Sequence, residues 1–374
     1  MIFMALDHIR DYFHADAFLF DPTDLTKTNV VLFFTRFITH YCAPVFVFLA
    51  GTSAFLVGIR KGKYELSIFL LTRGLWLIFL ELFIINFGWF FNIQFPFIPL
   101  IVVWAIGIGM ITLAAFLHLP LKVILGCGLL IIFGHNALDG VHVTGEGFGA
   151  VMWSILHEPA AFPMDGMVLF VGYPVLPWIG VMLVGYCFGS FYKPDFDRAK
   201  REKMLLYLGS GAIILFVILR YVNIYGDPAH WSTQSTPVLT FLSFLNVTKY
   251  PPSLLYVLVT VGPAMIFLSF AEKIKGTLAD AISVFGRVPM FYYLLHIYII
   301  HLLAMAAAVL TGYDATAMIF TQWINGSPEL QGYGFSLGIV YLIWIGVVLA
   351  LYPLCRWYDK YKISNKDKVW PSYL

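Results

Sequence analysis

Residues 66–90 read LSIFLLTRGLWLIFLELFIINFGWF, an apolar stretch whose ionisable side chains are Arg73 and Glu81. At about 1.5 Å per residue, a helix of this length reaches roughly 37 Å, which exceeds the ~30 Å hydrocarbon core of a bilayer. The stretch therefore predicts a transmembrane helix.

Similar apolar runs recur along the whole chain. The runs predict nine spans, at approximately 38–58, 66–90, 97–117, 120–134, 167–191, 204–223, 253–271, 288–310 and 334–355. A tenth helix precedes residue 14, but Met1–Phe13 reaches only about 20 Å. We expect helix one to be truncated at its start, or the natural chain to begin upstream.

The composition agrees with this pattern of spans. The chain has 374 residues, of which 60% are hydrophobic and 12% are charged, and its mean hydropathy is +0.83. An average soluble domain carries roughly 25% charged residues, so a soluble enzyme, a disordered chain and a nucleic-acid binder are excluded. The prediction is an all-α polytopic transmembrane bundle of about ten helices, forming a single domain over residues 1–374.

Basic residues are distributed unevenly between the two sides of the predicted bundle. Seventeen of the 23 Lys and Arg side chains fall in one set of alternate loops and in the C-terminal tail. They are Arg60, Lys61, Lys63, Lys122, Lys193, Arg198, Lys200, Arg201, Lys203, Lys273, Lys275, Arg287, Arg356, Lys360, Lys362, Lys366 and Lys368. By the positive-inside rule this side faces the cytoplasm, so both termini are predicted to be cytoplasmic.

Histidines gather on the opposite side. Seven of the ten lie at or beyond the outer ends of the predicted helices: His8, His14, His40, His135, His142, His157 and His230. Imidazole suits proton transfer near neutral pH, so this gathering indicates an outward-facing catalytic or binding vestibule. The alternative is that histidine simply suits the membrane interface. The four cysteines are scattered without a CxxC spacing, and no metal site is predicted.

The densest ionisable group lies near the N-terminus. Asp7, Arg10, Asp11 and His14 are spaced i, i+3, i+4 and i+7, so they share one helix face, and His8 lies beside them. A carboxylate beside an imidazole orients the ring and raises its basicity. This predicts His14 and His8 as catalytic residues, with Asp7 and Asp11 orienting them. A salt-bridge network at a helix end is the alternative.

Further ionisable side chains lie within or beside the predicted spans. Glu81 sits near mid-membrane, where such residues are functional candidates by default. Arg73 lies about 12 Å from it along the axis and can meet an anionic phosphate or snorkel to the interface. Arg287 opens the span at 288–310 and can also bind phosphate. His296 and His301 are five positions apart, a poor spacing for a metal, and a helix–helix hydrogen bond is the alternative for His296.

The segment around residue 40 carries a second polar pair. Arg36 and His40 are four positions apart and share a helix face. Pro44 is expected to loosen the helix near its outer start, while Gly51 and Ser53 allow close helix packing.

Four segments in this order resemble bacterial members of the heparan-α-glucosaminide N-acetyltransferase-like membrane proteins, in the transmembrane acyltransferase group. They are MALDHIRDYFH (4–14), FFTRFITHYCAPVFVFLAGTSAFL (33–56), LLTRGLWLIFLELFIINFGW (70–89) and GRVPMFYYLLHIYIIH (286–301). The resemblance implies a polytopic helical bundle that takes an acetyl group from cytosolic acetyl-CoA. It implies delivery to an amino sugar on the far side of the membrane.

The resemblance also implies roles for the N-terminal histidines. The family's catalytic histidine follows helix one on the outer side, and His14 matches it by position. Related membrane acyltransferases place an arginine eleven positions before a histidine on helix one. If His8 were that histidine, the arginine would fall before Met1, and the family's usual Leu-Asp…Arg-Gly opening is likewise absent.

Together these features predict a transmembrane N- or O-acetyltransferase of the bacterial inner membrane, with a carbohydrate-like acceptor and no metal. Residues expected to bind acetyl-CoA are Arg73, Arg287, Arg36 and His296. Residues expected to line the substrate path are Arg10, His40, Glu81 and His301. The alternatives are a proton-coupled transporter of a small solute, with Glu81 and His296 as relay, and a non-catalytic membrane protein. Membrane lipid is an expected partner, nucleic acid is not, and homodimer formation is left open.

Overall fold

The computed structural model describes residues 1–365 and 368, so Lys366 of the basic set lies outside the described residues. Within them, eight helical segments are long and apolar enough to cross a membrane. These segments are Val30–Gly58, Lys63–Phe90, Leu121–Leu138, Val175–Tyr192, Arg198–Val222, Leu254–Ala271, Pro289–Leu310 and Leu337–Ser364. The prediction of a helical polytopic membrane protein is confirmed, while its orientation across the membrane stays a prediction.

Two further helices complete the expected set but are shorter. Helix α6 (Val102–Phe116) is apolar and has 15 residues, and α1 (Ile2–Phe13) has 12. Most of α1 is buried, including its polar residues His8 and Arg10. Helix α1 therefore packs inside protein along most of its surface.

The chain divides into two compact units. The first unit comprises Met1–Cys42, Phe83–Ile98 and the described chain from Ile274 onward, and the second comprises Ala43–Leu82 and Pro99–Lys273. The prediction of a single domain over residues 1–374 stays a prediction.

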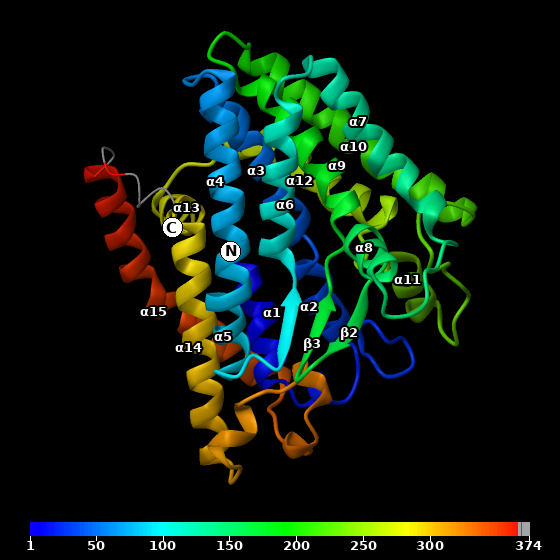
Figure 1. Ribbon diagram of the computed structural model, residues 1–374, viewed down its shortest axis with the longest axis vertical. Coiled ribbons are helices and arrows are strands. Elements are labelled where there is room, and N and C mark those ends of the chain that lie inside the picture. The colour runs from blue at the N-terminus through cyan, green and yellow to red at the C-terminus, as the bar shows by residue number, and fades with distance from the viewer. Residues whose placement is uncertain (366–367, 369–374) are drawn as a thin grey trace. The chain divides into compact units, whose positions relative to one another are not determined.

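The first unit contains α1 and the C-terminal helices (Figure 1). Helix α1 packs against α2 (Val30–Thr39), α14 (Pro289–Leu310) and α15 (Leu337–Ser364). The remaining elements of this unit are η1 (Ala15–Phe18), α5 (Asn86–Phe90), α13 (Thr277–Arg287), η5 (Ala315–Met318), η6 (Ile324–Gly326) and η7 (Pro328–Leu330).

The second unit contains most of the long spans. Helix α10 (Arg198–Val222) packs on α12 (Leu254–Ala271), and α9 (Val175–Phe188) packs on both α6 and α7 (Leu121–Gly134). The other helices are α3 (Cys42–Gly58), α4 (Lys63–Phe79), the π-helical segment η2 (Leu80–Ile85, which crosses into the first unit), η3 (His135–Leu138), α8 (Phe148–Leu156), η4 (Gly189–Tyr192) and α11 (Pro237–Leu245).

A small sheet is present at two places where the apolar pattern of the sequence predicted helix. Strands β2 (Ala160–Met164) and β3 (Met167–Val171) form an antiparallel hairpin, and the span expected from residue 167 begins only at Val175. The reason is the Asp165–Gly166 turn between them, because Asp-Gly favours a two-residue hairpin and Gly166 has φ +77°.

The third strand corrects the span expected from residue 97. Residues Phe97–Leu100 form β1, which pairs with β3, and α6 starts after Ile101. Pro99 disfavours a helical conformation at the preceding residue, which explains why the helix begins later.

Pro44 has the local effect expected from the sequence. Helix α2 ends at Thr39 and α3 begins at Cys42, so the segment Val30–Gly58 is interrupted at His40 and Tyr41. A proline inside a helix lacks a donor and clashes with the carbonyl four residues earlier, which here belongs to His40.

Glycines allow the close approach of α4 and α6. A Cβ atom added to Gly74 would lie 2.6 Å from the carbonyl oxygen of Gly107, and one added to Gly107 would lie 2.8 Å from that of Gly74. Small residues at crossing points are typical of helix packing in membranes, where close backbone approach supplies much of the attraction.

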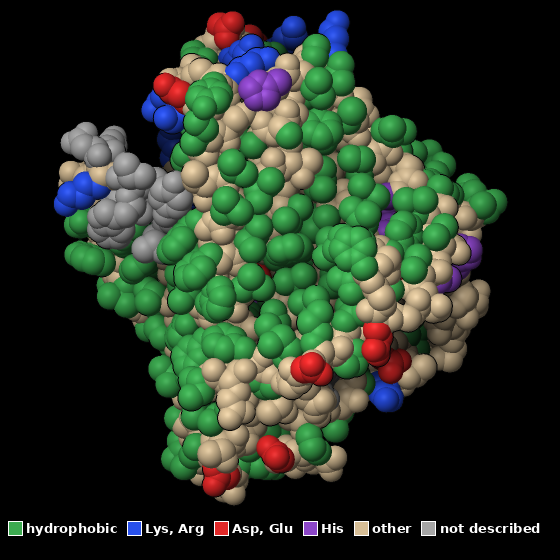
Figure 2. Space-filling view, viewed as in Figure 1, with side chains coloured by type: hydrophobic (Ala, Val, Ile, Leu, Met, Phe, Trp, Pro, Cys, Tyr) green, Lys and Arg blue, Asp and Glu red, His purple; other side chains and the backbone are tan. Residues whose placement is uncertain are grey.

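Apolar side chains on the outside of the helices support a lipid-facing surface. Figure 2 shows hydrophobic side chains over the face that includes α4 and α6. Helix α4 exposes Ile68, Leu71, Leu75 and Phe79. In the most apolar 18-residue stretch of α10, only 22% of the residues are buried. Exposed apolar surface of this extent is stable in hydrocarbon rather than in water.

Candidate active site

Helix α1 positions most of the predicted catalytic residues inside the first unit. Its apolar residues Ile9 and Tyr12 are fully buried, and its polar residues His8 and Arg10 are 8% and 2% exposed as whole residues. Because polar groups inside a bundle require partners, the contacts of this helix determine its chemistry.

Two arginines and two carboxylates form an ionic cluster on α1 and α2. Arg36 Nη1 donates to both oxygens of Asp7, at 2.8 and 2.7 Å, and Arg10 Nη2 lies 2.9 Å from Asp7 Oδ1. Arg10 Nη2 also donates to Asp11 at 2.6 Å, and the Thr39 hydroxyl donates to Asp7 at 2.9 Å. The two guanidinium groups balance the two carboxylates in charge. The cluster therefore joins α1 to α2 and carries no net charge.

This cluster brings together four of the predicted site residues and gives the carboxylates arginine partners. Arg36 was expected to bind acetyl-CoA and Asp7 to orient a histidine, yet the two side chains form an ion pair with each other at 2.7 Å. The salt-bridge alternative from the sequence analysis therefore describes the geometry of Asp7, Arg10 and Asp11 well.

His8 and His296 form a buried pair although 288 positions separate them. His8 Nδ1 lies 2.8 Å from His296 Nε2, and the two rings stack with centroids 4.9 Å apart. His296 Nδ1 lies 2.9 Å from the carbonyl oxygen of Tyr292, which only accepts, so this nitrogen carries a proton and donates. In the neutral pair, His296 Nε2 then accepts from His8 Nδ1, and the hydrogen-bond network assigns the lone pair of His8 to Nε2.

Trp89 and Tyr293 surround the ring of His8. The centroids of these side chains lie 4.7 and 5.9 Å from that of His8, in edge-on arrangements. Neither aromatic residue was predicted to belong to the site, because aromatic side chains are abundant throughout the sequence and their positions alone do not mark a site.

His301 lies in a separate set of contacts from His296. Its Nδ1 is 2.9 Å from the Gly88 carbonyl oxygen and its Nε2 is 2.7 Å from that of Met318, while the Tyr12 hydroxyl lies 3.3 Å from Nδ1. The two histidines thus occupy different sectors of α14, as their spacing indicates.

His14 occupies the end of α1 rather than its helical face. The helix ends at Phe13, and His14 adopts an extended conformation (φ −80°, ψ 130°), which corrects the expectation that His14 continues the i, i+7 face. The segment beside it pairs with Phe335, whose backbone N–H donates to Phe13 at 2.7 Å.

The side chain of His14 is buried but incompletely bonded. It is 7% exposed, and its Nδ1 has no hydrogen-bond partner within the described part of the chain. Burial lowers the pKa of His14 below 6.5, and the charge of Arg10 acts in the same direction while Asp16 opposes it. A neutral imidazole with an available nitrogen can accept a proton or attack a carbonyl.

The remaining predicted residues have contacts of their own. His40 is buried at the end of α2 in the first unit. Arg287 is held by Asp359, with Nε 2.9 Å and Nη2 2.7 Å from Asp359 Oδ2, so an anionic ligand would compete with this carboxylate. Arg73 and Glu81 belong to the second unit, where the guanidinium of Arg73 lies over the ring of Phe69.

Glu81 has a structural partner at the start of α6. Its Oε2 accepts the backbone N–H of Trp104 at 2.9 Å, and the side chain is fully buried. A carboxylate at a helix N-terminus satisfies unpaired N–H groups and interacts favourably with the helix dipole. This contact gives Oε2 of an acidic residue at membrane depth a structural partner, while its Oε1 has no hydrogen-bond partner in the described residues.

The fold and these contacts define a class: an integral membrane protein that buries histidines and a neutral ionic cluster among its helices. Residues 1–220 match the family described as heparan-alpha-glucosaminide N-acetyltransferase, catalytic. Because the match covers more than half of the chain, the protein belongs to this family of membrane acetyltransferases. No curated protein and no solved structure matched the chain.

Proposed function

We propose that the protein transfers an acetyl group from acetyl-CoA to an amino sugar or related carbohydrate on the extracytoplasmic side of the membrane, with His14 as the reacting histidine. The observation that carries this proposal is the buried imidazole of His14, whose Nδ1 is unpaired within the described residues and whose pKa is lowered by burial. Membership of the acetyltransferase family supports the donor class.

In direct transfer, His14 acts as a general base. Its nitrogen takes the proton of the acceptor amine or hydroxyl while that group attacks the thioester carbonyl carbon. The new C–N or C–O bond forms, the C–S bond breaks, and the CoA thiolate leaves with the electron pair. The imidazolium then returns its proton to the sulfur.

In transfer through an acyl-enzyme, the same nitrogen is the nucleophile. It forms an acetyl-imidazole as the C–S bond breaks, and the CoA thiolate leaves with the electron pair and takes up the proton that the imidazole loses. The acceptor then attacks the acetyl carbon, the bond from that carbon to the histidine nitrogen breaks, and the acceptor's proton returns to the imidazole. His8 is the second candidate for either role, because pairing with His296 fixes its tautomer in the neutral pair. We propose Arg73 and Arg287 as ligands of the CoA phosphates.

The test uses the full chain in lipid nanodiscs with radiolabelled acetyl-CoA and glucosamine as acceptor. We expect transfer by the wild type, and loss of transfer with retained acetyl-CoA binding in His14→Ala. His142→Ala is the matched control, since His142 is an exposed histidine that pairs with Glu158 at 2.8 Å. Unchanged turnover in His14→Ala would remove His14 from the mechanism.

Two further outcomes separate the routes and the activity itself. Label retained on the protein after incubation without acceptor, in the wild type but not in His14→Ala, would establish the acyl-enzyme route. A folded wild-type protein that binds no acetyl-CoA at millimolar concentration would refute the proposed function.

A further inference from the structure

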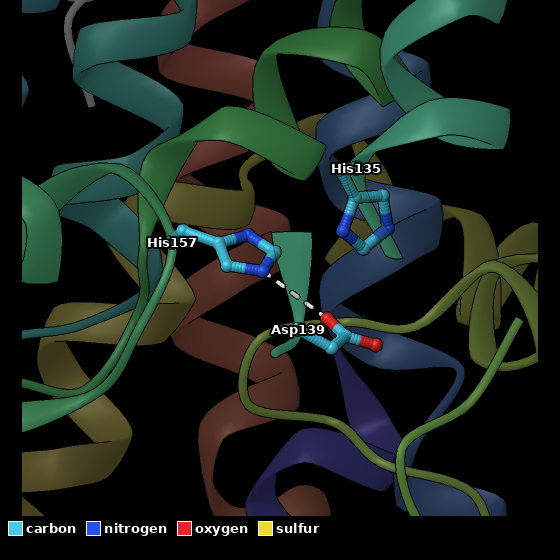
Figure 3. A group of neighbouring side chains, drawn as sticks. All are labelled: His135, Asp139 and His157. Atoms are coloured by element: carbon cyan, nitrogen blue, oxygen red, sulfur yellow. Dashed lines mark hydrogen bonds and ion pairs between the residues drawn. The ribbon is translucent and has the colours of Figure 1, made fainter. Parts of the chain in front are cut away.

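A second group of titratable side chains lies in the second unit. His135 begins η3, Asp139 follows its end, and His157 follows the end of α8. One possible ligand atom from each side chain lies within 4.8 Å of the others. Figure 3 shows the two imidazole rings and the carboxylate pointing toward one another.

The hydrogen bonding of this group is incomplete. His157 Nε2 lies 3.1 Å from Asp139 Oδ1, and the rings of His135 and His157 pack edge-on with centroids 5.7 Å apart. His135 is 3% exposed, and neither of its ring nitrogens has a hydrogen-bond partner in the described residues. The His157 side chain is also 3% exposed, and its Nδ1 has no hydrogen-bond partner among the described residues. A buried imidazole with two unpaired nitrogens is unfavourable, so a ligand that binds His135 is favoured.

The geometry suits a tetrahedral metal ion. Two ligand atoms of one zinc ion, each about 2.0–2.1 Å from the metal, are separated by roughly 3.3 Å. The 3.1 Å between His157 Nε2 and Asp139 Oδ1 is close to that separation, and His135 offers a ring nitrogen within the 4.8 Å that encloses the three ligand atoms. Binding would replace the proton now shared by His157 and Asp139.

The surroundings support the carboxylate in this role. Asn136 Nδ2 donates to Asp139 Oδ2 at 2.8 Å, which leaves Oδ1 as the oxygen that faces His157. Hydrogen bonds of this kind orient ligating carboxylates in metal sites. The Asp139 side chain is 20% exposed, so an ion can reach the group from solvent.

We propose that His135, Asp139 and His157 bind one divalent transition-metal ion of the zinc class, with a fourth coordination position for water or an anion. Two imidazoles and one carboxylate favour such ions over magnesium and calcium, which prefer oxygen ligands. The ion joins the end of α7, through η3, to the end of α8 and closes the exposed loop between them. This site is independent of the proposed transferase chemistry.

The test measures metal binding by the untagged full chain in detergent. After chelator treatment and dialysis, the protein is titrated with Co²⁺ as a spectroscopic probe and then with Zn²⁺ as competitor, and bound metal is counted by mass spectrometry. We expect one equivalent of metal and the visible ligand-field bands of low-coordinate Co²⁺. His157→Ala and Asp139→Asn are expected to weaken binding more than ~100-fold, beyond the range for loss of a supporting hydrogen bond.

His142→Ala is the matched control, because it removes a histidine that pairs with a carboxylate on the exposed side of the same loop. It is expected to bind metal as the wild type does. If His157→Ala does not fold, Asp139→Asn decides the question, since it keeps the shape of the side chain. Absence of stoichiometric metal in the wild type, or equal binding by Asp139→Asn and the wild type, would overturn the proposal.

Discussion

Replacing Asp7 by asparagine is expected to destabilise the first unit strongly. The side chains of Asp7, Arg36 and Arg10 are 14%, 11% and 3% exposed, so the charges that they carry are shielded from water. Asp7→Asn leaves two arginines against the single carboxylate of Asp11 and so places one uncompensated charge in the cluster.

The magnitude follows from this imbalance. Removing one partner of a buried ion pair costs about 3–5 kcal/mol, and the asparagine oxygen still accepts one hydrogen bond, so we expect the lower end, about 3 kcal/mol. That figure corresponds to a change of roughly 100-fold in the unfolding equilibrium. It is measured by titrating the protein in mixed micelles with dodecyl sulfate and following the near-ultraviolet signal of its tryptophans.

Two comparisons make the prediction specific to charge. Asp24→Asn alters an exposed carboxylate that bonds locally to Thr26, and it is expected to leave the transition unchanged. Adding Arg36→Met to Asp7→Asn restores the charge balance, so the double variant is expected to be more stable than Asp7→Asn alone by at least ~1 kcal/mol. A transition for Asp7→Asn that coincides with that of Asp24→Asn would refute the reasoning.

Three further outcomes follow from single contacts. Burial lowers the pKa of His14 below 6.5, and the neutral form of the ring is the one that reacts. Acetyl transfer should therefore be constant from pH 7 to 8 and should decline only as the pH falls below 6.5. A pH–rate profile with its midpoint above that value contradicts this assignment. Gly74→Ala should lower the free energy of unfolding by about 1–3 kcal/mol, because the added methyl group collides with Gly107. Open space surrounds Gly211, so Gly211→Ala should raise the same free energy by about 0.5–1 kcal/mol in the same unfolding assay. Glu81→Gln keeps an oxygen that accepts the backbone N–H of Trp104 in α6, so this variant should keep the stability of the wild type. Glu81→Leu removes that oxygen and should lower the free energy of unfolding by about 0.5–2 kcal/mol. If the protein carried a solute into vesicles and Glu81→Gln abolished this uptake, the result would favour the transporter alternative.

The spans were predictable because each depends on local composition alone. A run such as 66–90 must be apolar to cross hydrocarbon, and the structure places helix over nearly all of it. The hairpin at Ala160–Val171 was missed because its strands are as apolar as a span, and only the Asp165–Gly166 turn distinguishes them. Length and hydropathy therefore locate the helices, while turn residues correct their ends.

The pairing of the polar residues could be predicted only in part. The spacing of Asp7, Arg10 and Asp11 indicates a shared helix face, and the structure joins them there. The partner of His8, in contrast, is 288 positions away, and nothing local to either residue identifies the other. His135 and His157 were predicted only as outer histidines. The i, i+4 spacing of His135 and Asp139 was nevertheless a signal of a metal-ligand pair, because two residues at this spacing share one helix face.

The contacts of α1 couple stability to the proposed chemistry. The same 12-residue helix carries Asp7, which joins it to α2, and His8, which joins it to α14 through His296. His14 lies directly after its end, and the backbone there is held by Phe335. A helix this short gains little stability by itself, so its position depends on its apolar packing together with these polar contacts. Loss of the ionic cluster should therefore displace both histidines, and Asp7→Asn should lower acetyl transfer even where the protein remains folded.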